Sequence, residues 1–114
     1  MNFIPRQAKV YLAVGNTDMR KSINGLSLLV TEEFSLDPFT GSLFAFCNRR
    51  RDIVKILFWD NNGFCIWHKR LEKDRFCWPR SEFEVVNIDS KQMSWLLAGL
   101  EIQKAHKKLS YREV

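Results

Sequence analysis

Three consecutive arginines stand between two of the most apolar stretches of the sequence. Arg49, Arg50 and Arg51 follow residues 43–47 and precede residues 53–59, and both flanking stretches have the composition of buried strands. The planar guanidinium group of arginine can donate two parallel hydrogen bonds to a phosphate, which makes arginine the side chain best fitted to that ligand. The triplet is therefore either a turn that charge keeps solvated or a site that faces a polyanion.

The net charge of +5 is concentrated in the same part of the chain. Residues 49–80 hold nine Lys and Arg residues and four Asp and Glu residues, which gives +5, whereas the rest of the 114-residue chain has nine of each and sums to zero. A local excess of this kind is typical of a surface that binds a polyanion. Lys69 and Arg70, at the end of a third apolar stretch, are further candidates for phosphate contacts.

A second cationic pair lies where a helix is expected to begin. Residues 17–21 read Thr-Asp-Met-Arg-Lys, and Thr17 or Asp18 can cap a helix whose apolar positions continue to about residue 34. Arg20 and Lys21 would then occupy the first turn, where a cation opposes the helix dipole and costs about 0.3–1 kcal/mol. Either Asp18 compensates them, or they form an anion-binding corner with the N-terminal backbone N–H groups.

The residue types and their spacing argue against a zinc site and against a catalytic site. Cys47, Cys65, His68 and Cys77 are of the kinds that bind zinc, but Cys65 and His68 lie three apart on an expected strand and so point to opposite faces. The chain has no C-x-x-C pair, P-loop, nucleophile elbow or H-E-x-x-H motif, and no carboxylate cluster that suits a two-metal nuclease. We therefore predict no catalytic residue, no metal and no cofactor.

The elements that must position the basic residues make up a single α+β domain. The patterns predict a mainly antiparallel sheet, a meander of about four or five strands, packed by a helix in the N-terminal half and by a C-terminal helix capped by Asp89 or Ser90. The domain covers residues 1–100, and residues 101–114 form a polar, basic tail. The expected strands are residues 8–14, 43–47, 53–59, 64–71 and 84–88, with a short edge strand at 75–79.

Two turns join the central strands of this meander. Asn48 to Asp52 is expected to form a hairpin loop that carries the arginine triplet at its tip. Asp60 to Gly63 is a second hairpin signal, centred on either Asn61-Asn62 or Asn62-Gly63. The two choices differ by one residue in register, and so they exchange the faces of the strand that follows.

The sequence predicts a cytoplasmic location for the protein. The apolar runs are too short and too often interrupted by charge to cross a membrane, and residues 1–6 lack the layout of a signal peptide. The three cysteines are an odd number, which argues against a disulfide framework and favours a reducing compartment.

An ordered set of short motifs resembles a known family over about residues 8–100. The family is that of the small TnpB-type accessory proteins, encoded by the second open reading frame of IS66 insertion sequences. Ser22 departs from the glycine expected after the Met-Arg-Lys run. The motifs are Thr17-Asp18-Met19-Arg20-Lys21, Gly25-Leu26, Asp37-Pro38, Gly41-Ser42-Leu43-Phe44-Ala45-Phe46, Arg49-Arg50, Lys55, Trp59-Asp60, Gly63, Lys69-Arg70-Leu71-Glu72 and Trp78-Pro79.

The resemblance implies a part in moving a bacterial transposable element, in a chain separate from the larger transposase. We therefore expect a non-catalytic accessory factor that binds DNA, for example the ends of the element. The alternative is a protein-interaction module that docks the transposase of the same element through the same basic and aromatic surface. The residues expected to contact phosphates are Arg49, Arg50, Arg51, Lys69 and Arg70, joined by Arg20 and Lys21.

Overall fold

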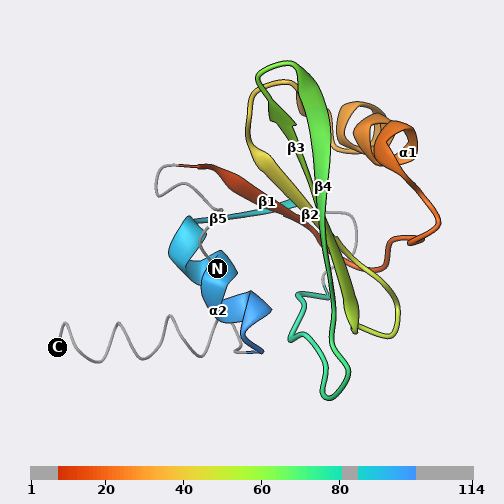
Figure 1. Cartoon of the computed structure of the whole chain (residues 1–114), viewed down its shortest axis with the longest axis vertical. Coiled ribbons are helices and arrows are strands. Elements are labelled where there is room, and N and C mark those ends of the chain that lie inside the picture. Colours follow the sequence, from red (N-terminus) through yellow and green to blue (C-terminus); the bar gives the residue numbers. More distant parts are fainter. Residues whose placement is uncertain (1–7, 81–84, 100–114) are drawn as a thin grey trace, which may run out of the picture.

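A five-stranded mixed sheet forms the centre of the molecule, with a helix against each face (Figure 1). The computed structural model describes residues 8–80 and 85–99. The strand order across the sheet is β4-β3-β2-β1-β5. The strands are β1 (Val10–Ala13), β2 (Leu43–Cys47), β3 (Ile53–Asp60), β4 (Gly63–Arg70) and β5 (Val85–Ile88). The predicted α+β class is confirmed.

The meander expected from the sequence is formed by β2, β3 and β4, which pair antiparallel in that order. β1 lies parallel to β2, with Val10 opposite Leu43, and β5 pairs antiparallel with the free side of β1. The parallel contact follows from the connection through the first helix, since such a crossover returns the chain to the end of the sheet where it started. Sequence patterns carry no direct signal for this pairing.

The hairpin between β3 and β4 turns on Asn61-Asn62, with Asp60 paired to Gly63. Asn61 adopts a φ of 56°, a left-handed conformation that asparagine tolerates better than most residues. This register places Trp67 opposite Ile56 and Ile66 opposite Leu57. It thereby decides which side chains of β4 face each helix.

The first helix begins later than the sequence suggests, so the predicted cap at Thr17 or Asp18 is wrong. α1 (Ile23–Leu28) has Ser22 as its N-cap, without a side-chain capping bond, and continues into a π-helical turn, η1 (Leu29–Glu33). Before it, the Asp18 carboxylate accepts a hydrogen bond from the backbone N–H of Arg20 at 2.9 Å and closes a local turn. Such side-chain bonds compete with helix formation.

The second helix follows its prediction closely. α2 (Ser90–Leu97) is capped by Asp89, whose carboxylate accepts from the N–H of Gln92, while the Gln92 side chain accepts from the N–H of Asp89. This is a capping box. Its apolar residues Met93, Leu96 and Leu97 are buried, whereas Leu100 and the predicted tail at 101–114 lie outside the described residues.

Each face of the sheet has its own apolar core. The side chains of Leu12, Ala45 and Ile56 face α2, and those of Phe44 and Leu57 face α1 and η1. Along each strand the alternation of faces follows the pleat. No helix among residues 8–80 and 85–99 is long and apolar enough to cross a membrane.

The edge strand predicted at 75–79 does not form. This segment instead fills the core on the α2 side, where Phe76 and Trp78 are 1% and 4% exposed. Trp78 donates its indole N–H to the carbonyl of Ala13 at 2.9 Å. Two large rings gain more from burial than a short edge strand that ends at proline would gain from pairing.

Candidate nucleic-acid interface

The loop between β2 and β3 is a tightly bonded hairpin tip. Asn48 organises it, because its side-chain oxygen accepts hydrogen bonds from the N–H groups of Asp52 and Ile53, both at 3.1 Å. Its side-chain nitrogen donates to the Asp52 carboxylate at 2.7 Å. Arg51 completes the turn with a φ of 62° and donates its N–H to the carbonyl of Asn48. The arginine triplet thus sits on a fixed backbone.

The segment after β4 docks on this tip and brings more cations to it. Leu71 donates its N–H to the carbonyl of Asp52 at 2.7 Å, and Phe76 donates to the carbonyl of Arg51 at 2.8 Å. Residues 71–76 therefore form a loop beside the tip, at the same end of the sheet (Figure 1). Lys73 and Arg75, which were not among the predicted site residues, join the triplet there.

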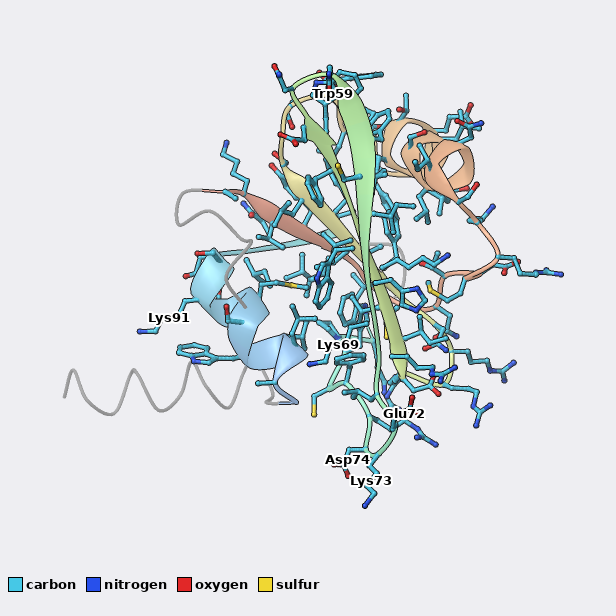
Figure 2. The ribbon with its side chains drawn as sticks, viewed as in Figure 1. Trp59, Lys69, Glu72, Lys73, Asp74 and Lys91 are labelled. Carbon is cyan, nitrogen blue, oxygen red and sulfur yellow. The ribbon has the colours of Figure 1, made fainter. Side chains whose placement is uncertain are left out.

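We call this cluster the arginine end: Arg49, Arg50, Arg51, Arg70, Lys73 and Arg75. The acidic residues in the same segments are Asp52, Glu72 and Asp74. Together with the six basic residues they give a net charge of +3. Figure 2 shows Glu72, Lys73 and Asp74 together at this extremity of the molecule.

Asp52 lies at the electrostatic centre of the arginine end. The hydrogen bond from Asn48 holds the pKa of its carboxyl below the usual range, and the charges of Arg50 and Arg75 lower it further. Arg70 forms an exposed ion pair with Glu72 at 3.0 Å, which raises the pKa of the guanidinium. Part of the positive charge is therefore already balanced within the cluster.

Arg49 and Arg50 differ from these paired residues. Both are exposed, and among residues 8–80 and 85–99 neither side chain has a hydrogen-bond or ion-pair partner. A guanidinium on a fixed backbone with no internal acceptor can bind an external anion without first breaking a contact.

Lys69 lies apart from the arginine end, on the face of the sheet that α2 covers. Its ammonium donates to the carbonyl of Leu97, at the C-terminus of α2, at 3.1 Å (Figure 2). A cation at this end of a helix is favourable because the last carbonyls carry partial negative charge. The structure gives Lys69 a role in fixing α2 to β4.

Arg20 and Lys21 sit in the turn before α1, beside the end of β2, where Thr17 donates its N–H to the carbonyl of Cys47 at 2.8 Å. Arg20 pairs with Asp18 at 2.7 Å, and its hydrogen bonds lower the pKa of Asp18 to about 2. Compensation by Asp18, one of the two predicted alternatives, is thus what the geometry shows for Arg20. The other alternative relied on a helix N-terminus at this point, and α1 starts only at Ile23.

Lys55, which was not among the predicted site residues, holds this turn in place. Its ammonium donates to the carbonyls of Met19 and Lys21 at 2.8 and 3.2 Å. The sequence feature that could have indicated this role is a single lysine within an apolar strand, because a cation at such a position needs a hydrogen-bond acceptor. Gly25 supports the arrangement as well, because a Cβ there would lie only 3.1 Å from the Cβ of Lys21.

The thiols lie away from any ligand cluster. Burial raises the pKa of the Cys47 thiol to about 12, which keeps it protonated. Cys65 shares a face with Trp67 and Lys69 towards α2, while His68 lies on the opposite face, as predicted. The described part of the chain contains no group of three potential metal-binding side chains.

One group of aromatic residues lies far from the arginine end. Phe39, Trp59 and Phe64 form a cluster with ring centroids 5.0–5.1 Å apart. Figure 2 shows Trp59 at one extremity of the molecule and the loop with Lys73 at the other. We call these three rings the ring cluster.

Comparisons with known proteins agree with the sequence motifs. The model of the family described as IS66 Orf2 like protein matches residues 8–107. Two proteins of Sinorhizobium fredii, both described as uncharacterized, are similar along most of their length. The first, y4hO, is 38% identical over 96 residues, or 84% of each chain, and the second, y4jC, is 29% identical over 103 residues, or 90% of this chain and 88% of the other. No solved structure matches. The family match spans nearly the whole of the folded domain, and the chain therefore belongs to the IS66 Orf2-like family of transposition-associated proteins.

Proposed function

We propose that the chain is a non-catalytic accessory factor of transposition that binds DNA phosphates through its arginine end. The observation that carries the proposal is the exposed pair Arg49 and Arg50, which stand on a fixed hairpin tip and whose side chains form no hydrogen bond or ion pair with the described residues. Family membership supplies the process, and the geometry of the tip supports the mode of action.

The fixed tip favours binding because little ordering is required. The bonds of Asn48 within the loop and the two backbone bonds from residues 71–76 hold the backbone from which the triplet extends. Only side-chain rotamers remain to be fixed by a ligand, and each costs about 0.5–1.5 kcal/mol. Charge-assisted hydrogen bonds to phosphate exceed that cost.

The contacts differ in their expected contributions. Arg49, Arg50 and Arg51 are the principal ones, and Lys73 and Arg75 extend the surface. Arg70 contributes less, since Glu72 competes with phosphate for its guanidinium. Arg20 is balanced by Asp18, and Lys21 flanks the surface from the turn before α1. Lys69 acts indirectly, by fixing α2.

A charge-matched pair of variants tests the proposal. Arg49→Ala/Arg50→Ala and Lys9→Ala/Lys91→Ala each remove two exposed cations, so both lower the net charge equally. We expect the arginine variant to bind a random-sequence duplex roughly tenfold or more weakly than wild type, because each site loses a charge-assisted bond. The lysine variant should change affinity less than about threefold, through long-range charge alone. Equal losses, or no loss in the arginine variant, would refute the assignment.

A second candidate function is protein docking, which the sequence placed on one basic and aromatic surface. The arginine end and the ring cluster lie at opposite ends of the sheet, so docking would use the ring cluster. Phe39 is 57% exposed there, and residues 37–42 and 59–64 hold Asp37 and Asp60 but no Lys or Arg. Aromatic side chains are frequent anchors of protein interfaces.

The test of this second candidate uses the purified transposase of the same element. Calorimetric titration should show binding that Phe39→Ser weakens and that Arg49→Ala/Arg50→Ala leaves unchanged. The reverse pattern would assign the transposase to the arginine end, and the absence of binding would remove the candidate.

A further inference from the structure

Among residues 8–80 and 85–99, the arginine end carries no exposed Phe, Tyr or Trp ring on which a base could stack. An exposed imidazole, that of His68, lies on β4 two residues before Arg70. The rings next to it in the fold, Phe46, Phe76 and Trp78, are 1%, 1% and 4% exposed. Phe76 and Trp78 lie in the core beneath α2, and Phe46 lies in the core beneath α1. Their faces are covered by other side chains of the protein.

The ring cluster, which includes the exposed Phe39, lies far from the arginine end. The ring cluster brackets the β3–β4 turn, and Trp59 is six residues from Ile53 along β3. At about 3.3 Å per residue, the two ends are separated by roughly 20 Å. A nucleotide whose phosphate binds Arg49 therefore cannot place its own base on Trp59.

This separation distinguishes between two forms of nucleic acid. Proteins that bind single strands without sequence preference combine a basic groove with aromatic side chains that stack on successive bases. A duplex keeps its bases stacked inside and presents two dense rows of phosphates, so cations alone suffice for binding. In the part of the chain that the structure describes, the arginine end provides cations on a fixed backbone and no exposed Phe, Tyr or Trp ring for a base.

We infer that the ligand of the arginine end is the phosphate backbone of double-stranded DNA, bound without contacts that distinguish one base pair from another. This inference rests on the proposed function and narrows it to duplex over single strand and to backbone over bases. Recognition of a specific sequence at the element ends then belongs to another component of the transposition machinery.

The fixed geometry supports the same conclusion. Arg49 and Arg50 project from a turn that Asn48 and the loop at 71–76 hold in place, which suits the regular spacing of phosphates on a duplex. A single strand has a flexible backbone and would have to be ordered at the expense of its own conformational entropy. Without stacking, that expense has no compensation.

The experiment compares three labelled probes of equal length by fluorescence anisotropy at one salt concentration: an element-end duplex, a duplex of scrambled sequence, and the single strand of the first. We expect the two duplexes to bind within about threefold of each other, since reading bases would cost roughly fivefold or more per mismatched pair. The single strand should bind on the order of tenfold more weakly, because it lacks half the charge density and gains no stacking.

Substitutions in the ring cluster test whether its aromatic side chains take part in binding DNA. Trp59→Ala should leave all three affinities unchanged, and Phe39→Ala, in an exposed loop, provides a second variant if loss of Trp59 impairs folding. A single strand that binds more tightly than the duplex and is weakened by either ring variant would overturn the inference but leave DNA binding intact. Preference for the element-end duplex by more than fivefold would also overturn it. Binding to none of the probes would refute the proposed function itself.

Discussion

Asn48 is the residue on which the arrangement of the tip depends most. One side chain satisfies two backbone N–H groups and one carboxylate, and so it determines where the next three residues point. The sequence shows an asparagine at the start of a turn, which is common and did not single it out. Its role follows only from the contact with Asp52, four residues later.

Replacing this residue should loosen the tip. We expect Asn48→Ala to lower the free energy of unfolding by about 1–3 kcal/mol, because three hydrogen bonds are lost and two backbone N–H groups lose their partner. DNA affinity should fall as well, although no cation is removed. Asn62→Ala, at the exposed turn of the other hairpin, is the matched control and should change stability by less than about 0.5 kcal/mol. Urea titration measures both, and equal effects would contradict the role of Asn48.

The Asp18–Arg20 pair provides a titration test at the same scale. The pKa of Asp18 is lowered to about 2 by hydrogen bonds from Arg20, so Arg20→Gln should raise it towards the ordinary 3.8. A lowered folded-state pKa contributes stability above the unfolded value, and that contribution is lost as the pH falls through the folded pKa. Carboxyl NMR titration of the two proteins gives both midpoints. A midpoint near 3.8 in wild type would mean that the pair does not form in solution.

At the scale of elements, the three central strands were predicted more accurately than the start of the first helix and the segment that follows β4. The limits of β2, β3 and β4 agree with the sequence to within a residue at each end, because apolar runs bounded by turn residues leave little freedom. The start of α1 and the segment at 75–79 were predicted wrongly. Before α1, the local turn closed by Asp18 is held in place by Lys55. In the segment at 75–79, a tertiary contact decides, because Trp78 binds Ala13 across 65 residues.

The buried indole of Trp78 gives a test of the second contact. Trp78→Phe should lower the free energy of unfolding by about 2–4 kcal/mol, since it leaves a cavity and deprives the carbonyl of Ala13 of its donor. Trp95→Phe, on the half-buried side of α2, should cost less than about 1 kcal/mol. Thermal unfolding followed by circular dichroism compares them. If both substitutions cost the same, residues 75–79 do not anchor the core in the way described.

At the scale of the whole molecule, the arginine end and the ring cluster occupy opposite ends of one sheet. The sequence places Arg51 and Trp59 only eight residues apart, and so it suggests a mixed surface. Most of β3 lies between these two residues and holds them apart, because its eight extended residues span most of the length of the sheet. The candidate triplet could be predicted from charge, whereas Lys73, Arg75 and the internal role of Lys69 required the fold.

The salt dependence of duplex binding tests the central claim most directly. For a phosphate-binding protein the logarithm of the affinity falls linearly with the logarithm of salt, with a slope of about −0.9 per phosphate contact. Changing Arg49, Arg50 and Arg51 together to Ala should leave the circular dichroism spectrum intact, weaken binding, and flatten the slope by about 2–3. A folded triple variant whose slope equals that of wild type would contradict the account.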